Sequence, residues 1–286
     1  MPTVVIPAYN EANGIERCVR SVLHDRIDGL TVVVVPNACR DDTAARARAF
    51  GGNVLVAETS VGGKTNAINL GERTLREAGA DHFPRLFLDG DIELEAGTLR
   101  ALFAAAAEPG ARVVAAQPRF ECRQSSLPVR LFYAANRFNP HHLTTAPNGS
   151  GTYCVNAEAR ARWGEFPNII ADDGFVERHF AQHERATVLG CHSIVRVPRT
   201  YAALLGIGAR KRVGARELER ILPLREDQHA AGGTFKAVAR ATLTNPLLWP
   251  AFVVWTFTKL WERREREKLQ AKAPTEQWQH DRSSRQ

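Results

Sequence analysis

Two aspartates separated by a single glycine are the residues of this chain best suited to chemistry. Asp89, Gly90 and Asp91 directly follow the apolar run 86–88, which predicts a buried strand that ends at the carboxyl edge of a sheet. Ligands of open α/β sheets bind at that edge. Paired carboxylates are hard oxygen donors that suit Mg²⁺ or Mn²⁺, and such a metal would hold a diphosphate. The alternative is a solvated turn, because Asp and Gly are frequent turn residues.

The elements that must position these aspartates alternate along the first half of the chain. Short apolar and β-branched runs predict strands at 3–6, 31–35, 54–56, 86–88 and 113–116. Helical patterns predict helices at 15–23, after 41–42, at 64–78 and at 95–107. This order predicts an α/β fold with a Rossmann-type, mainly parallel sheet flanked by helices. The stretch 119–200 is less regular, with expected elements at 128–137, 152–155 and 193–197.

Composition sets broad limits on function. The chain has 286 residues, of which 44% are hydrophobic and 24% charged, and its formal net charge is +7. A positive charge permits nucleic acid, anionic lipid or phosphorylated substrates as partners without choosing among them. The five cysteines are scattered and include no C-x-x-C pair, so we expect neither a disulfide framework nor a zinc site. With no visible signal peptide and no run of about 18 apolar residues, we expect a cytoplasmic protein without a spanning helix.

Further motifs follow one another in a fixed order along residues 3–180. They comprise V-I-P-A-Y-N-E at 5–11, V-P-N-A-C-R-D-D-T at 35–43, G-K-T-N-A-I-N at 63–69, N-G-S-G at 148–151 and D-D at 172–173. With Asp89 and Asp91 in the place of a D-x-D motif, this ordered set resembles glycosyltransferase family 2. The resemblance implies a GT-A fold and inverting transfer from a nucleotide sugar. The chain departs from the family pattern at Pro36, Ala38 and Cys39, where the family has an acid, a glycine and a serine.

The resemblance implies a nucleotide-sugar site built from several segments. Its residues would be Pro7, Ala8, Tyr9, Asn10, Glu11, Asn37, Lys64, Asp89, Gly90 and Asp91. Asn37 would hydrogen-bond a nucleobase, most simply uracil, because an amide offers both a donor and an acceptor. Lys64 would meet a phosphate or shape the base pocket. Asp89 would contact the ribose and the metal, and Asp91 would ligate the metal directly.

The general base implied by the resemblance is Asp173, and Asp172 stands where the family has a glutamate. Inversion at an anomeric carbon needs a carboxylate that takes the proton of the acceptor hydroxyl. The alternative is that both aspartates cap a helix that begins at Gly174. Arg210 and Arg212 would supply a cation to the diphosphate, unless they belong to a solvated or lipid-facing helix. The acceptor-side loop would comprise Asn148, Gly149, Ser150 and Gly151.

The C-terminal part contains an apolar segment with three tryptophans. Segment 247–260 is apolar almost all round and is interrupted by Pro250 and Lys259, with an alternation of acids and bases after it. This pattern suits an interfacial helix that contacts an anionic membrane through 247–268, on the inner face of the cytoplasmic membrane. The alternative is a helix packed on the catalytic domain.

The expected organisation follows from these motifs. We expect a GT-A catalytic domain at 1–225 with a nucleotide-sugar half (1–118) and an acceptor half (119–225), then a linker (226–234), a helical appendage (235–270) and a disordered tail (271–286). The expected activity is metal-dependent, inverting transfer of a sugar from a UDP-sugar to a glycan or lipid-linked acceptor hydroxyl. One alternative is a nucleotidyltransferase, although the Gly-rich, Arg-bearing loop of that class does not follow the first strand. Another is a non-catalytic basic module, but no basic surface with interleaved aromatic residues is visible, so nucleic acid is not expected.

Overall fold

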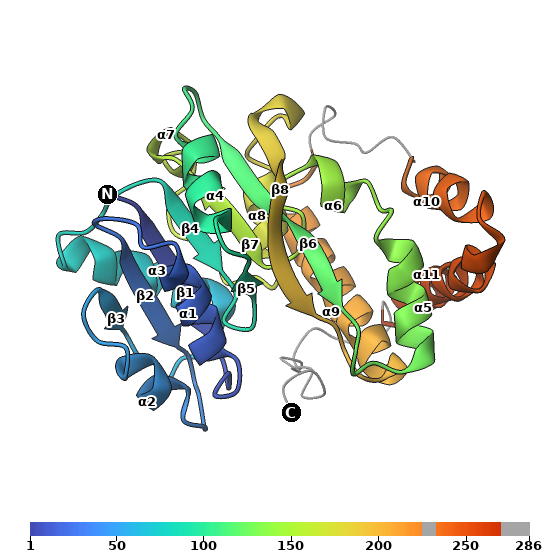
Figure 1. The fold of residues 1–286 in the computed structure, drawn as a ribbon, viewed down its shortest axis with the longest axis horizontal. Coiled ribbons are helices and arrows are strands. Elements are labelled where there is room, and N and C mark those ends of the chain that lie inside the picture. Colours follow the sequence, from blue (N-terminus) through green and yellow to red (C-terminus); the bar gives the residue numbers. More distant parts are fainter. Residues whose placement is uncertain (225–232, 270–286) are drawn as a thin grey trace.

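The computed structural model describes residues 1–224 and 233–269 (Figure 1). The predicted tail at 271–286 and most of the predicted linker at 226–234 lie outside the described residues. The end of that predicted linker, from Gly233, belongs to a helix.

Eight strands form one mixed sheet with the order β3-β2-β1-β4-β7-β6-β8-β5. Their bounds are β1 (Thr3–Ala8), β2 (Thr31–Pro36), β3 (Val54–Val56), β4 (Arg85–Leu88), β5 (Glu93–Leu94), β6 (Val113–Glu121), β7 (Thr152–Val155) and β8 (Arg185–Arg196). Strands β1 to β4 are parallel, and β6 is parallel to β8. Strand β7 is antiparallel to both of its neighbours, and β5 is antiparallel to β8. The predicted α/β fold with a mainly parallel sheet is therefore confirmed.

Helices cover both faces of the sheet. They are α1 (Ile15–His24), α2 (Thr43–Arg48), α3 (Lys64–Glu77), α4 (Thr98–Ala106), α5 (Leu127–Asn136), α6 (His141–Thr144), α7 (Ala157–Arg160), α8 (Asp172–Glu177), α9 (Tyr201–Ile221), α10 (Gly233–Leu243) and α11 (Trp249–Leu269). One hydrophobic core joins the sheet to α1, α2 and α4. A second core on the opposite face joins it to α3, α7, α8 and the end of α9.

Strand β1 shows why the central strands read as unbroken apolar runs. Val4 and Ile6 belong to one core, whereas Val5 belongs to the other, so both faces of the strand are buried. A strand buried on both faces has no polar side to alternate with. Helix α3 crosses β1 at Gly71, where a Cβ atom would lie 2.7 Å from Val5 Cγ1. This close approach fixes the start of α3 beside the carboxyl ends of the strands.

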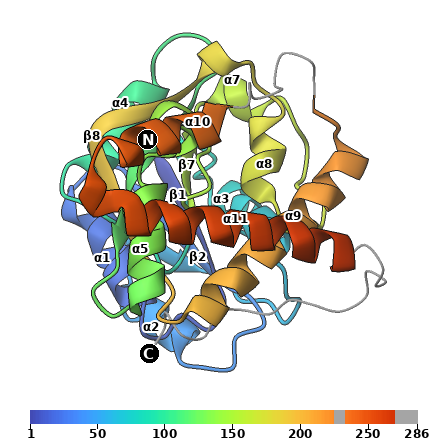
Figure 2. The ribbon, with the colours of Figure 1, turned by 90° about the vertical axis from the view of Figure 1, so that its right-hand side faces the viewer.

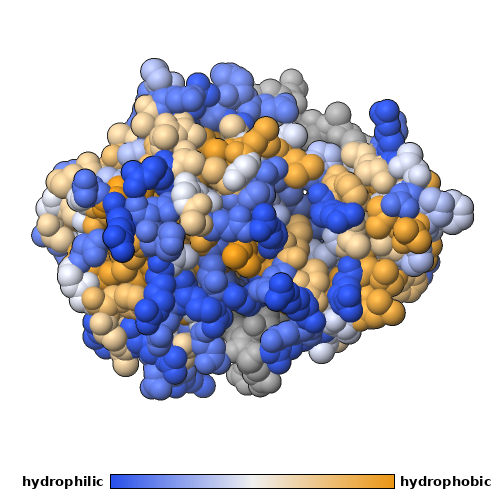
Figure 3. Space-filling view, in the orientation of Figure 1, coloured by the Kyte–Doolittle hydropathy of each residue, from blue (hydrophilic) through white to orange (hydrophobic). Residues whose placement is uncertain are grey.

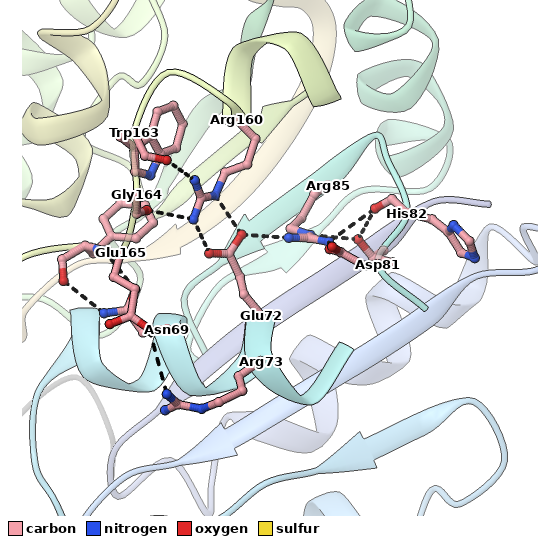
Figure 4. A network of polar contacts seen from close by, with 12 residues as sticks. Asn69, Glu72, Arg73, Asp81, His82, Arg85, Arg160, Trp163, Gly164 and Glu165 are labelled. Carbon is pink, nitrogen blue, oxygen red and sulfur yellow. Dashed lines mark hydrogen bonds and ion pairs between the residues drawn. The ribbon is translucent and has the colours of Figure 1, made fainter. Parts of the chain in front are cut away.

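A buried ion network also holds α3 against the sheet (Figure 4). The Glu72 carboxylate accepts hydrogen bonds from Arg85 Nη1 of β4 at 2.7 Å and from Arg160 Nη2 of α7 at 2.6 Å. Arg85 Nη2 also donates to Asp81 Oδ1 at 2.5 Å. Glu72 and Arg85 are 2% and 1% exposed, and their charges are compensated within the network, Glu72 by Arg85 and Arg160 and Arg85 by Glu72 and Asp81.

A third core lies between α5, α9, α10 and α11. Helix α11 runs unbroken from Trp249 to Leu269, so Pro250 and Lys259 interrupt the apolar run of the sequence but not the helix. Pro250 lies in the first turn, where the missing N–H removes no helical hydrogen bond. Among the described residues, no helix is long and apolar enough to cross a membrane.

Candidate functional site

The site lies at the carboxyl ends of β1 and β4, which are adjacent and parallel. In the order β3-β2-β1-β4, the chain adds β2 and β3 on one side of β1 and β4 on the other. The topological switch point therefore lies between β1 and β4, and open α/β sheets bind ligands at such a point. Asp89 follows β4, and its backbone N–H donates to Gly151 O at 2.9 Å. A Cβ atom on Gly151 would lie 2.6 Å from Asp89 Oδ2. The predicted acceptor-side loop therefore touches the first aspartate of the D-x-D motif.

Lys64 is the centre of the charged residues in this site. Its Nζ lies 2.6 Å from Asp89 Oδ1 and 3.0 Å from Asp172 Oδ1. Lys64 is the first residue of α3, and it follows Gly63, whose φ of 138° is open to glycine. The structure thus brings together three residues that the sequence places in separate motifs.

Burial and neighbouring charges set the protonation of this cluster. Burial would lower the pKa of Lys64, but Asp172, Asp89 and Asp173 together raise it well above its usual value. Burial raises the pKa of Asp172 to about 7, with Asp173 and Asp89 adding to the rise and Lys64 opposing it. Burial also raises the pKa of Asp173, again against the effect of Lys64. A carboxylate with a raised pKa is a stronger proton acceptor.

Helix α8 presents the two adjacent aspartates differently. It begins at Asp172, and within the described residues no side chain caps it, so the alternative in which both aspartates cap a helix that begins at Gly174 is wrong. Asp172 commits Oδ1 to Lys64, whereas its Oδ2 and Asp173 Oδ1 are buried without a hydrogen-bond partner among the described residues. A buried carboxylate oxygen of this kind is suited to accept a proton.

Asn37, after β2, is used by the protein itself. Its Nδ2 donates to Ala8 O at 2.8 Å, and its Oδ1 accepts from Gly63 N at 3.2 Å. The residue is 1% exposed. Its amide therefore ties the ends of β1 and β2 to the start of α3, and both of its hydrogen-bonding groups are engaged.

A cleft of about 550 Å³ opens beside Tyr9. Its lining residues come from the ends of β1, β2 and β3 and are Tyr9, Ala38, Cys39, Arg40, Glu58, Thr59 and Ser60. Asn10 has a φ of 52°, and its Oδ1 accepts from Arg40 N at 2.8 Å, which shapes one wall. The sequence prediction did not include Arg40, Glu58, Thr59 or Ser60, because polar loop residues carry no periodic signal.

The acceptor-side loop is held from two directions. Asn148 is fully buried, its Nδ2 donates to Ala116 O at 2.8 Å, and its Oδ1 accepts from Ser150 Oγ. His142 Nδ1 lies 3.1 Å from Asn148 O, and its Nε2 lies 3.3 Å from Asn136 Nδ2. Asn136 Oδ1 in turn accepts from Trp255 Nε1 of α11 at 3.2 Å. A hydrogen-bonded chain therefore connects α11 to the loop.

Lys211 contacts this loop, whereas the sequence prediction had assigned the cation of this region to Arg210 and Arg212. Lys211 Nζ lies 3.4 Å from Gly149 O. Its partial desolvation lowers its pKa, and Lys259 and Arg210 lower it further, whereas Asp173 opposes the shift. Arg212 instead faces α11, where its Nη1 lies 3.4 Å from Glu262 Oε2.

The carboxylates at the end of β4 fit a divalent metal that is shared with a substrate. Asp89 is one-third exposed at its side chain, and Asp91 is partly exposed. Among the described residues, no cluster of three or more His, Cys, Asp or Glu side chains exists to enclose a metal. Mg²⁺ is commonly held by one or two carboxylates plus substrate phosphates rather than by an all-protein cage. The donor set of Asp89 and Asp91 matches that arrangement.

A sheet of this order with polar residues at the carboxyl ends of β1, β2 and β4 defines an α/β protein of the GT-A class. Residues 3–150 match the profile of glycosyl transferase family 2, and the chain belongs to this family. It is a glycosyltransferase, so the predicted family membership and enzyme class are confirmed. The nucleotidyltransferase and non-catalytic alternatives find no support.

Solved structures of similar fold agree with this family. Glucosyl-3-phosphoglycerate synthase from Mycobacterium tuberculosis, in complex with UDP, is 20% identical with a TM-score of 0.53, over 79% of this chain and 81% of that one. S. aureus TarS 1–349, in complex with UDP-GlcNAc, is 15% identical with a TM-score of 0.50, over 95% and 92% of the two chains. No curated protein sequence matches the chain.

Proposed function

We propose that the protein is a metal-dependent, inverting glycosyltransferase that moves a sugar from a UDP-sugar to a hydroxyl of a glycan or lipid-linked acceptor. The observation that carries the proposal is the position of Lys64 Nζ, within 3.0 Å of both Asp89 and Asp172. This lysine joins the donor-side D-x-D motif to Asp172, the residue next to the candidate base Asp173. Bound UDP and UDP-GlcNAc in structures of similar fold favour a uridine nucleotide as the donor.

The donor nucleotide would occupy the cleft beside Tyr9. Tyr9 lines the cleft and offers a flat face for a base, and it directly follows Pro7 and Ala8 at the end of β1, with Asn10 next in the bend. Glu11 is 5% exposed and supports that turn, since its N–H donates to Thr43 Oγ1 at 2.8 Å. Asn37 then acts by holding the ends of β1 and β2 in place rather than by presenting a free amide.

The diphosphate would lie between the cleft and the aspartates. Asp91 would ligate the metal directly, and Asp89 would contact the ribose and the same metal, with Gly90 between them. A bound divalent metal would act as a Lewis acid that stabilises the charge of the departing nucleoside diphosphate. Lys64 supplies a second, permanent positive charge to the same region.

The transfer would be a single displacement with Asp173 as general base. The acceptor oxygen forms a bond to the anomeric carbon while the bond from that carbon to the diphosphate oxygen breaks. The acceptor proton passes to the Asp173 carboxylate, and the bonding electron pair leaves with the nucleoside diphosphate. Asp172 would orient Lys64, because the ion pair occupies one of its oxygens.

The acceptor would bind at the loop Asn148 to Gly151, beside Lys211. Arg210 adds positive charge near Lys211, whereas Arg212 is ion-paired with Glu262 of α11 and would contribute only through that contact. The division into a donor half (1–118) and an acceptor half (119–225) belongs to the same proposal. So does peripheral contact with an anionic membrane from the cytoplasmic side through 247–268.

Two substitutions test the reaction. Asp91→Asn should abolish metal-dependent UDP binding in calorimetry, whereas Asp173→Asn should leave UDP binding within about twofold and lower turnover by on the order of 100-fold or more. Asp28→Asn, at an exposed acid outside the site, is the matched control. Turnover that survives both changes would overturn the proposal.

A further inference from the structure

We propose that the outer face of α10 and α11 docks on the surface of an anionic lipid bilayer. This docking face comprises Phe235, Leu247, Trp249, Val253, Phe257 and Leu260. Each of these side chains is at least 52% exposed, although each is large and apolar. The docking is independent of the proposed reaction, because none of these residues belongs to the candidate site.

Helix α11 has two apolar faces with different surroundings. Ala251, Trp255 and Thr258 are at most 2% exposed and face the core shared with α5, α9 and α10. Trp249, Val253, Phe257 and Leu260 follow at intervals of four, four and three residues, which places them on one stripe of a helix. That stripe is 52–64% exposed. The sequence alone left open whether this helix packs on the domain or lies at a membrane interface. In the structure one face of α11 packs on the domain, and the opposite face is available for an interface.

Exposed apolar side chains also occur beside the stripe, on α10 and in the connection between the two helices. Phe235 of α10 is 52% exposed, and Leu247 in the connection to α11 is 86% exposed. Figure 2 shows α10 and α11 across the front of the molecule, with α5 and α9 behind them. Figure 3 shows apolar surface on the side where these helices lie. Isolated exposed apolar residues are ordinary, but a contiguous set marks an interaction surface.

The charges around this surface fit an anionic partner. Lys236, Arg240, Arg263 and Arg264 are all exposed. Among residues 233–264 the single acid is Glu262, whose side chain is 15% exposed and ion-paired with Arg212 and Lys259. The exposed charge over these residues is therefore positive only. An amphipathic helix with Trp and Phe on one face and Arg and Lys beside it lies in the plane of a bilayer interface.

A second copy of the chain would fit this surface less well. A symmetric dimer through the docking face would bring the two sets of arginines and lysines together, and like charges across an interface oppose association. Phosphatidylglycerol-type headgroups complement the same cations at about 1 kcal/mol for each basic residue near the surface. Since no helix among the described residues can span a bilayer, the contact is one of surface docking.

Co-sedimentation of the full chain with vesicles tests the docking. The vesicles are phosphatidylcholine alone and a 7:3 mixture of phosphatidylcholine and phosphatidylglycerol. Wild type should bind the mixture and bind phosphatidylcholine at least tenfold more weakly. The double variant Val253→Ser/Phe257→Ser should lose at least tenfold in binding, and Arg263→Gln/Arg264→Gln about fivefold for each arginine. Leu189→Ser, at a 75% exposed leucine of β8, is the control and should bind as wild type does.

The controls keep folding and catalysis apart from docking. Every variant should melt within about 3 °C of wild type and bind UDP as wild type does. Equal vesicle binding by Val253→Ser/Phe257→Ser and wild type would overturn the proposal, as would equal binding to both kinds of vesicle. A concentration-dependent dimer in sedimentation velocity that the same double variant abolishes would overturn it in favour of a second copy. A wild-type protein that binds vesicles but shows no sugar transfer would count against the proposed reaction only.

Discussion

Lys64 Nζ lies 2.6 Å from Asp89 Oδ1, so the first residue of α3 is ion-paired with the first residue after β4. The two elements run beside β1, and their pairing places a permanent positive charge at the carboxyl edge of the sheet. Because Asp172 shares the same ammonium group, a movement of Lys64 would affect both the donor side and the residue next to the candidate base Asp173.

Removal of this charge should impair both sides of the site. We expect Lys64→Met to lower kcat/KM by on the order of 100-fold, since one preorganised cation is lost from a partly buried site. UDP affinity should fall as well. Lys64→Arg keeps the charge and should retain more than half of the UDP-binding free energy in calorimetry. If Lys64→Met binds UDP and turns over as wild type does, the central role of Lys64 is wrong.

The raised pKa of Asp172 predicts a definite dependence of stability on pH. Its folded-state pKa of about 7 lies above the unfolded value near 3.8, so the folded state binds the extra proton. The favourable contribution is complete below about pH 3.8 and is lost as the pH rises to about 7. Asp172→Asn mimics the protonated form. Its free energy of unfolding relative to wild type should therefore rise between pH 5 and pH 8, by on the order of 2–4 kcal/mol.

Urea denaturation at several pH values measures this difference. The Asp28→Asn variant, at an exposed acid, should follow wild type throughout. A constant difference between Asp172→Asn and wild type from pH 5 to pH 8 would contradict the raised pKa.

The sequence predicted the positions of the site residues better than their partners. Lys64 at a helix start and Asp89 after a strand follow from local patterns, because strand ends and helix starts are encoded locally. The ion pair between Lys64 and Asp172 depends on the packing of α3 against α8, which no local pattern encodes. Lys211 was missed because the role of the diphosphate-binding cation was assigned from the sequence to Arg210 and Arg212. Successive helical residues point about 100° apart, so only one of the three faces the loop at Gly149.

The fold shows the same division. The buried strands β1 to β4 were predicted because both of their faces are apolar. Strand β7 lies between β4 and β6, and its insertion comes from tertiary pairing that separates β6 from the strands before it in sequence. The short β5 was not predicted, and the 21-residue α9 was anticipated only as an alternative, a basic helix that carries Arg210 and Arg212. Helix α9 is a mixture of small, apolar and basic residues, so its periodicity is weak.

Gly151 should be intolerant of a side chain for a reason specific to Asp89. Gly151 and Gly149 both have positive φ values, of 71° and 69°, so an alanine at either position costs about 1 kcal/mol in backbone strain. Only at Gly151 would the added Cβ meet Asp89, at 2.6 Å from Oδ2. Gly151→Ala should weaken metal-dependent UDP binding at least tenfold, whereas Gly149→Ala should weaken it by less than about threefold. Equal effects of the two variants would show that backbone strain alone is responsible.

The ion network of Figure 4 should dominate the stability of the contact between α3 and β4. Glu72→Gln leaves Arg85 and Arg160 without their shared carboxylate, and loss of one partner from a buried ion pair costs about 3–5 kcal/mol. The melting temperature should fall by roughly 5–10 °C. Glu77→Gln lies at an exposed position of the same helix and should change it by less than about 2 °C. Similar melting temperatures for the two variants would refute the role of the network.

His142 should remain neutral well below the pH at which free histidines are protonated. Burial, together with the nearby charge of Lys211, lowers its pKa to about 4 against the opposing effect of the hydrogen bond to Asn148 O. In the neutral form Nδ1–H donates to Asn148 O, and Nε2 accepts from Asn136 Nδ2.

This depressed pKa means that His142 stabilises the fold fully above about pH 6.5 and progressively less as the pH falls toward 4. Protonation would turn Nε2 into a donor that faces the Asn136 amide, which breaks the chain from Trp255 to the acceptor-side loop. His142→Gln keeps an acceptor for Asn136 but loses the donor to Asn148, so it should cost about 1 kcal/mol at pH 7. Its stability should also vary less than that of wild type between pH 6.5 and pH 4. Nitrogen-15 NMR of the imidazole ring provides the direct measurement, and a ring of His142 that is half-protonated near pH 6.5 would contradict the prediction.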